Sequence, residues 1–128
     1  MAIIQKNSAM ARVIGRTNQL SWEELVSIFH DQKKVKAAVL FGSRAGNSAG
    51  PQSDYDIAVW MDCPVGGLED PFYTLYANLP VLMNIQECDL DLVDLRKADA
   101  FLKRSIKDSY KIIKGNEDEI SRILAKDD

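Results

Sequence analysis

The chain has 128 residues, of which 46% are hydrophobic and 27% are charged, and its formal net charge is −3. This length and apolar content suit one domain, residues 1–128, built around one core, and they exclude a disordered chain or a repeat protein. The sequence has no run of about 18 apolar residues that could span a membrane, no apolar leader and no CxxC pattern, so we expect a cytoplasmic protein without structural disulfides or zinc.

Charge is distributed unevenly along the chain. Residues 45–95 carry nine Asp and Glu and no Lys or Arg, whereas residues 1–44 carry seven basic and three acidic side chains. Concentrated carboxylates repel one another unless solvent, a partner or a metal ion compensates their charge. The basic residues are neither in excess nor interleaved with aromatic residues, which argues against direct binding of nucleic acid.

The first half of the chain predicts one helix and two strands. A capping box from Ser21 to Glu24 precedes apolar residues at helical spacing and predicts a helix over residues 22–31, with a buried face of Trp22, Leu25, Val26 and Phe29. Residues 36–41 form a short apolar run that ends at a glycine and predicts a buried strand. A Gly, Ser and Pro-rich loop over residues 47–53 follows, and residues 55–61 are β-branched and aromatic, which indicates a second strand.

The second half predicts further helices around a third strand. Asp70 and Pro71 mark the start of a helix that Pro80 should end. Residues 88–95 alternate between polar and apolar and predict a strand. Residues 98–114 show helical spacing up to Gly115, with Lys103 among basic residues on a solvated or anion-steering face, and residues 117–126 suggest a short last helix. The expected fold class is therefore α/β (α+β), a small mixed sheet flanked by helices.

The pattern with the most chemical content joins the ends of the first two strands. Gly42 and Ser43 end one strand, and Asp54 and Asp56 begin the next one after ten intervening residues. A glycine and a serine at a strand end offer backbone N–H groups and a hydroxyl to a phosphate, and Arg44 directly after them is a further phosphate ligand. Aspartates at positions i and i+2 of a strand share one face, where their oxygens can bind a hard divalent cation.

A third carboxylate is expected from the strand at residues 88–95. Asp91 lies centrally in that strand, and Asp89 lies on the same predicted face one pleat step away. Carboxylates beside a phosphate-binding turn are typical of metal-assisted phosphoryl or nucleotidyl transfer. The alternative is structural: a turn glycine beside carboxylates of an edge strand.

The residues of this pattern resemble a known family. Val39-Leu40-Phe41-Gly42-Ser43-Arg44-Ala45, Ser53-Asp54-Tyr55-Asp56-Ile57-Ala58-Val59 and Leu90-Asp91-Leu92-Val93 are similar to the minimal nucleotidyltransferase (MNT) group of the polymerase-β-like superfamily, over a core of about residues 20–115. The resemblance implies a polymerase-β-like core, ATP as substrate and two Mg²⁺ ions. It implies that Asp54, Asp56 and Asp91 are the catalytic and metal-binding residues and that Gly42, Ser43 and Arg44 bind the nucleotide. Asp89 beside Asp91 leaves the third ligand open.

Members of this size resemble the antitoxin of a HEPN/MNT toxin–antitoxin pair. That likeness implies transfer of AMP from ATP to a tyrosine hydroxyl of a cognate HEPN ribonuclease, and a hetero-oligomer with that toxin. Two other functions stay open from the sequence: a non-catalytic antitoxin that neutralises its partner by direct binding, and a small-molecule nucleotidyltransferase that works with a separate substrate subunit.

Overall fold

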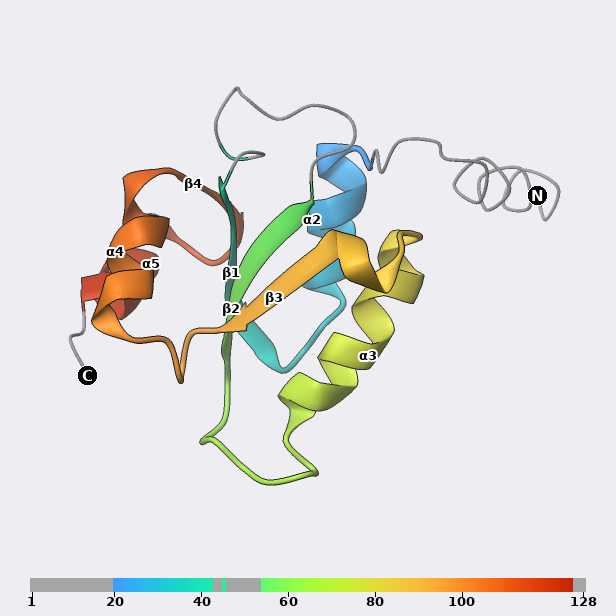
Figure 1. Ribbon diagram of the computed structural model, residues 1–128, viewed down its shortest axis with the longest axis horizontal. Coiled ribbons are helices and arrows are strands. Elements are labelled where there is room, and N and C mark those ends of the chain that lie inside the picture. Colours follow the sequence, from blue (N-terminus) through green and yellow to red (C-terminus); the bar gives the residue numbers. More distant parts are fainter. Residues whose placement is uncertain (1–19, 43–44, 46–53, 126–128) are drawn as a thin grey trace, which may run out of the picture.

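The computed structural model describes residues 20–42, 45 and 54–125 as one α/β arrangement (Figure 1). In chain order the elements are α2 (Trp22–His30), β1 (Val35–Phe41), β2 (Tyr55–Met61), α3 (Pro71–Met83), the 3₁₀ turn η2 (Glu87–Asp89), β3 (Leu90–Asp94), α4 (Ala100–Asp108), β4 (Tyr110–Lys114) and α5 (Glu117–Ala125). The loop expected over residues 47–53 lies outside the described residues.

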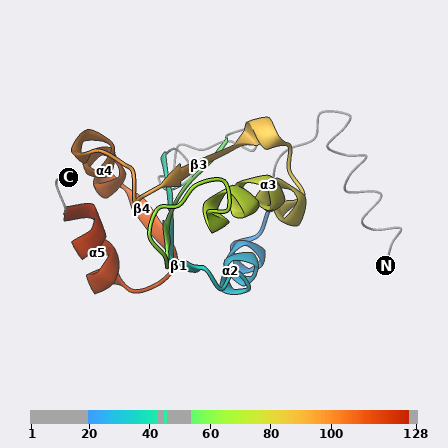
Figure 2. The same ribbon diagram turned by 90° about the horizontal axis from the view of Figure 1, so that it is seen from below.

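The strands form a mixed sheet in the order β3-β2-β1-β4. β1 pairs antiparallel with both β2 and β4, whereas β2 and β3 are parallel. Helices α2 and α3 cover one face of the sheet, and α4 and α5 cover the other (Figures 1 and 2). The mixed sheet flanked by helices that the sequence predicted is therefore confirmed.

Alternation along the strands divides the core between the two faces. Tyr55, Ile57 and Val59 of β2 pack with α2 and α3. Ala58, between them in the sequence, belongs to a second cluster with residues of α4 and α5. Every second side chain of β2 thus faces the same helical layer, which fixes the face on which its polar residues lie.

Helix α2 begins as predicted. The Ser21 side chain accepts a hydrogen bond from the Glu24 backbone, and the Glu24 side chain accepts one from the Ser21 backbone. Leu25 and Phe29 are buried, but the prediction that Trp22 belongs to the core is wrong, because this side chain is 39% exposed. Trp22 is the first residue of the helix, before the turn that carries the buried Leu25.

Helix α3 starts where the sequence predicted and ends later. The Asp70 side chain accepts a hydrogen bond from the Phe72 backbone at 3.0 Å, which caps the helix. Pro80 does not end it, because the helix runs through this proline to Met83 and closes at Asn84 in a left-handed conformation. In the last turn a proline removes one backbone hydrogen bond, and the helix tolerates that loss. Across the part of the chain that the structure describes, no helix is both long and apolar enough to cross a membrane.

The single helix predicted over residues 98–114 is wrong. Helix α4 ends at Asp108, Ser109 adopts an extended conformation, and residues 110–114 form β4 beside β1. The β-branched residues Ile112 and Ile113 suit a strand that pairs with the exposed edge of β1. Lys103 of α4, expected on a solvated face, is 3% exposed. The short helix expected after Gly115 is confirmed as α5.

Candidate nucleotide-transfer site

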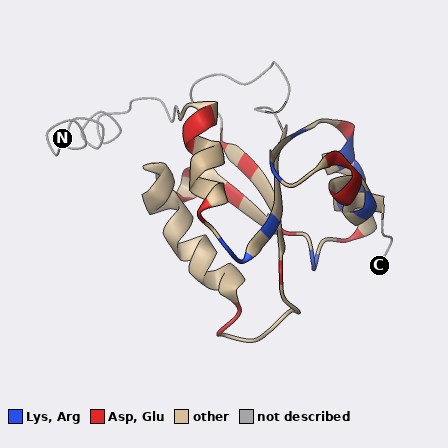
Figure 3. Ribbon diagram, turned by 180° about the vertical axis from the view of Figure 1, so that it is seen from behind, with Lys and Arg blue, Asp and Glu red and all other residues tan. Residues whose placement is uncertain are grey.

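Two aspartates predicted as site residues lie side by side on neighbouring strands. In the parallel pairing of β2 with β3, Asp56 is the register partner of Asp91. Their neighbours Ile57 and Leu92 face the α2 and α3 side of the sheet, so both aspartates face the opposite side. Red bands on strands in the middle of Figure 3 mark acidic residues of the sheet. The fold therefore brings together two carboxylates that are distant in the sequence.

The electrostatics of Asp56 reflect this placement. Its pKa is raised above the ordinary value, first by partial burial and then by the negative charges of Asp91 and Asp54. Asp54 itself is exposed and directly precedes β2. Asp54 and Asp91 therefore both repel the charge of Asp56, and a cation placed beside Asp56 would relieve this repulsion.

Gly42 directly follows the last residue of β1 and lies beside Asp56. Its φ angle is +73°, a left-handed conformation that favours glycine. A Cβ atom at this position would overlap the carboxylate oxygen Oδ2 of Asp56. The absence of a side chain thus leaves the space that the Asp56 carboxylate occupies, a role that the sequence pattern did not predict for this residue.

The other predicted site residues differ in what the structure says of them. Ser43 and Arg44 lie outside the described residues, so their expected nucleotide-binding roles stay predictions. The strand expected from residue 88 begins only at Leu90, because Glu87–Asp89 form the 3₁₀ turn η2. Asp89 is therefore not on the strand face that carries Asp91, which corrects the prediction that the two share it.

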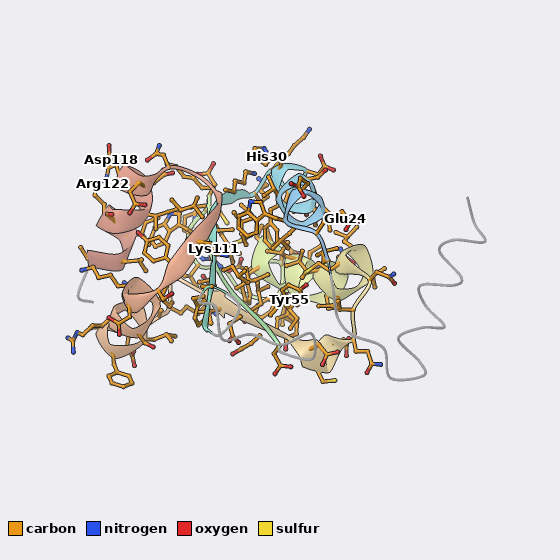
Figure 4. The ribbon with its side chains drawn as sticks, turned by 90° about the horizontal axis from the view of Figure 1, so that it is seen from above. Glu24, His30, Tyr55, Lys111, Asp118 and Arg122 are labelled. Carbon is orange, nitrogen blue, oxygen red and sulfur yellow. The ribbon has the colours of Figure 1, made fainter. Side chains whose placement is uncertain are left out.

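Tyr55, between the two aspartates of β2, anchors the opposite face of the sheet. Its side chain is 2% exposed. The hydroxyl accepts a hydrogen bond from the Leu20 backbone at 3.1 Å. Figure 4 shows Tyr55 near the sheet on the side of α2 and α3, away from Asp118 and Arg122 of α5. Tyr55 thereby ties the start of β2 to the residues that lead into α2.

The donor set fits a divalent cation, although the carboxylates do not converge on one point. Among the residues that the structure describes, no group of three Asp, Glu, His or Cys side chains is placed to hold a metal ion. Carboxylate oxygens are nevertheless the ligands that Mg²⁺ prefers. The pKa of Asp56 is raised first by burial and then by the negative charges of Asp91 and Asp54, and a cation would offset these charges. Asp54, Asp56 and Asp91 are the residues that would hold it.

The sequence did not predict a buried ionic network of Arg96, Asp94 and Asp70 at the C-terminal end of β3. Arg96 donates to Asp94 through Nε at 3.0 Å and to Asp70 through Nη2 at 2.8 Å. The pKa of Asp70 falls to about 2, first through hydrogen bonds from the Gly66 and Phe72 backbones and further through Arg96. One signal pointed to it: Arg96 is the first basic residue after the acidic stretch of residues 45–95.

We predict that Gly42→Ala lowers the nucleotidyl transfer expected from the sequence by about 100-fold, because a misplaced catalytic group typically loses that much. The new Cβ would displace the Asp56 carboxylate, and the positive φ angle would add strain. Labelled-nucleotide transfer measures the effect. Gly67→Ala is the matched control, because a Cβ at Gly67 meets no atom within 4 Å. Equal activity of the two variants would contradict the proposed contact between Gly42 and Asp56.

The fold and the paired carboxylates beside a glycine turn define a nucleotidyltransferase-like protein. The family model described as "Polymerase beta, Nucleotidyltransferase" matches residues 23–119, and the chain belongs to this family. A comparison with curated protein sequences finds no match.

Several solved structures have a similar fold. A chain of a toxin–antitoxin crystal structure with AMP-PNP is 24% identical, with 82% of each chain covered and a TM-score of 0.64. A chain of a tyrosine-to-alanine mutant of the toxin–antitoxin MntA–HpeT is 25% identical, with 83% of this chain and 81% of that chain covered and a TM-score of 0.63. A third similar chain belongs to a tri-AMPylated Shewanella oneidensis HEPN toxin in complex with MNT antitoxin, at 24% identity, coverage of 84% and 80%, and a TM-score of 0.59.

Proposed function

We propose that this chain is a Mg²⁺-dependent nucleotidyltransferase antitoxin that transfers AMP from ATP to a tyrosine hydroxyl of a HEPN ribonuclease toxin. The observation that carries this proposal is the pairing of Asp56 with Asp91 on one sheet face, beside the left-handed Gly42 and next to Asp54. Membership in the nucleotidyltransferase family supports the reaction class.

Each residue has a defined part in this reaction. Gly42, Ser43 and Arg44 hold the β- and γ-phosphates of ATP, and Asp54, Asp56 and Asp91 bind the metal. Bound Mg²⁺ supplies charge stabilisation for the transferring phosphate. Asp91 accepts the proton of the tyrosine hydroxyl while the hydroxyl oxygen forms a bond to the α-phosphorus. The bond from that phosphorus to the β-phosphate oxygen breaks, and pyrophosphate leaves.

The identity of the partner is supported by the similar structures and by the surface of α3. The similar chains come from toxin–antitoxin structures, one of which contains an AMPylated HEPN toxin. Pro71–Met83 contain no charged residue, although Tyr73, Tyr76 and Val81 are exposed. An exposed apolar surface of this kind commonly contacts another protein. We therefore propose that the chain forms a hetero-oligomer with its toxin. The complex would act in the cytoplasm, with ATP as the nucleotide donor.

Mass spectrometry of a HEPN protein encoded beside this chain tests the proposal. After co-expression, we expect the HEPN protein to gain the mass of one or more AMP units on a tyrosine. The gain should vanish with Asp54→Asn and persist with Asp62→Asn, which removes the same charge from an exposed residue after the other end of β2.

The remaining outcomes identify the other two functions. A HEPN protein that is inhibited without any gain in mass would contradict the transfer reaction and support neutralisation by direct binding. Transfer of AMP to a small molecule with the HEPN protein unmodified would instead indicate a small-molecule nucleotidyltransferase.

A further inference from the structure

The sequence of β3 does not by itself define which aspartate faces Asp56. Asp89-Leu90-Asp91-Leu92 repeats with a period of two residues. A shift of β3 by two residues would put Asp89 opposite Asp56, and Leu90 would take the place of Leu92 in the core. Side chains keep their faces in such a shift, so alternation alone cannot distinguish the two registers.

We propose that the Arg96 network fixes the register of β3, and that Arg96 and Asp94 are positioning residues for Asp91. Asp94 is the last residue of β3 and the register partner of Val59. Its carboxylate binds Nε and Nη2 of Arg96, at 3.0 and 2.8 Å. The end of the strand is thereby joined to a guanidinium group that has further partners elsewhere in the fold.

Those further partners belong to the segment before α3, not to β3. Arg96 donates through Nη1 to the carbonyl oxygens of Cys63 and Pro64, at 3.2 and 2.9 Å, and through Nη2 to both carboxylate oxygens of Asp70. The side chains of Arg96, Asp70 and Asp94 are 5%, 0% and 6% exposed. Arg96 therefore connects the end of β3 to a fixed and buried point outside the strand.

A two-residue shift is incompatible with this connection. It would move Asp94 and Arg96 about 7 Å along the strand direction. The hydrogen bonds to Cys63, Pro64 and Asp70 would break, and Asp70 would lose the only cation that the structure gives it among the described residues. The shift would also break the backbone hydrogen bond from Leu95 to Val59, at 2.9 Å.

The opposite end of β3 restrains the register less. The strand is at the edge of the sheet, with β2 as its one neighbour among the described strands. The preceding turn η2 lacks a side-chain cap and contains no buried residue. A 3₁₀ turn that unwinds gains length, because its rise of about 2 Å per residue grows to about 3.3 Å in a strand. The three residues of the turn can therefore supply about 4 Å of the roughly 7 Å that a shift needs, and the network at the other end opposes the shift.

The cost of burying Asp91, which is exposed in the observed register, adds a second restraint on the register. In the shifted strand Asp91 would lie opposite Ala58, which is fully buried. A carboxylate is disfavoured there, so loss of the network should loosen β3 and move Asp91 out of line with Asp56, with the shifted register as a minor state.

Two variants test the proposal on the intact 128-residue protein. Asp94→Asn keeps the shape of the side chain, and Arg96→Lys keeps the charge but lacks the planar fork that binds several oxygens at once. Glu119→Gln is the matched control, because it removes one partner of the Lys36–Glu119 ion pair, which joins β1 to α5 and includes no residue of β3. NMR cross-strand contacts between Asp56 and Asp91 and hydrogen exchange of the Leu95 amide report the register, and steady-state kinetics report kcat and KM for ATP.

We expect both variants to weaken the Asp56–Asp91 contacts and to speed exchange at Leu95 at least tenfold, while Glu119→Gln changes neither. The catalytic consequence rests on the proposed function: kcat should fall at least tenfold with KM for ATP within twofold, because the phosphates are held at the end of β1. Unchanged contacts and exchange in both variants would overturn the inference. Loosened contacts with an unchanged kcat would overturn the positioning role. A wild-type protein without transferase activity would refute the proposed function, whereas the NMR data would still decide the register.

Discussion

Replacing Asp56 with asparagine is expected to abolish nucleotidyl transfer and to leave the protein folded. Stabilisation of the transferring phosphate by metal ions is worth several kcal/mol, and each 1.4 kcal/mol corresponds to about tenfold in rate, so we expect a loss of about 1,000-fold or more. The carboxamide has the shape of the carboxylate but lacks the charge that a metal ligand needs. A loss of activity in a folded Asp56→Asn protein would therefore be caused by the lost charge and not by altered packing.

The same substitution should stabilise the metal-free protein. The pKa of Asp56 is raised by burial and by the charges of Asp91 and Asp54, so its ionised form is disfavoured in the folded state. At neutral pH this destabilises the fold, and the penalty grows as the pH rises through the raised pKa. Asparagine removes the penalty, and the free energy of unfolding should therefore increase without Mg²⁺.

Labelled ATP with the HEPN partner and Mg²⁺ measures the transfer, and urea denaturation with and without Mg²⁺ measures the stability. Asp62→Asn is the control for charge, because Asp62 is exposed and lies beyond the other end of β2. Labelling by Asp56→Asn at nearly the wild-type rate would contradict the assignment of Asp56 as a metal ligand. A metal-free Asp56→Asn protein that is less stable than the wild type would contradict the electrostatic account.

Much of the site was predictable because its signals are local. The strand from Tyr55 to Met61 is readable from β-branched and aromatic residues, and alternation within it places Asp56 on one face. The preceding strand ends at Phe41, directly before Gly42, as the sequence suggests. The conformation of Gly42 and its contact with Asp56 were not predictable, because they depend on the pairing of β1 with β2.

The features that the sequence did not predict correctly depend on residues that are distant in the sequence. Residues 98–114 have apolar side chains at helical spacing, but β1 leaves an edge that Tyr110–Lys114 complete as a strand. Local spacing cannot show that edge. The Arg96 network has the same character, since Arg96 binds Asp70 and the Cys63 carbonyl across more than twenty-five positions of sequence. Sequence reasoning assigned Asp70 only its capping role, which the structure also contains.

The difference between Asp91 and Asp89 gives the second large expected effect. Asp91→Ala should lower turnover by about 100-fold or more, because loss of a general base alone has this magnitude. Asp91 pairs with Asp56 in the sheet, and its charge contributes to the raised pKa of Asp56. Asp89 is in the turn η2 and is absent from the charges that raise this pKa.

Asp89→Ala should therefore change turnover by less than about threefold, since substitutions of surface residues outside the core and the site have small effects. Both variants remove one negative charge from adjacent parts of the same segment, so each controls for the change in overall charge in the other. Steady-state rates with the HEPN partner, ATP and Mg²⁺ give the ranking. If Asp89→Ala were the inactive variant, β3 would have to pair with β2 two residues out of the observed register, because only that shift brings Asp89 opposite Asp56. The ranking of the two rates thus reports both the third carboxylate of the site and the register of the strand that carries it.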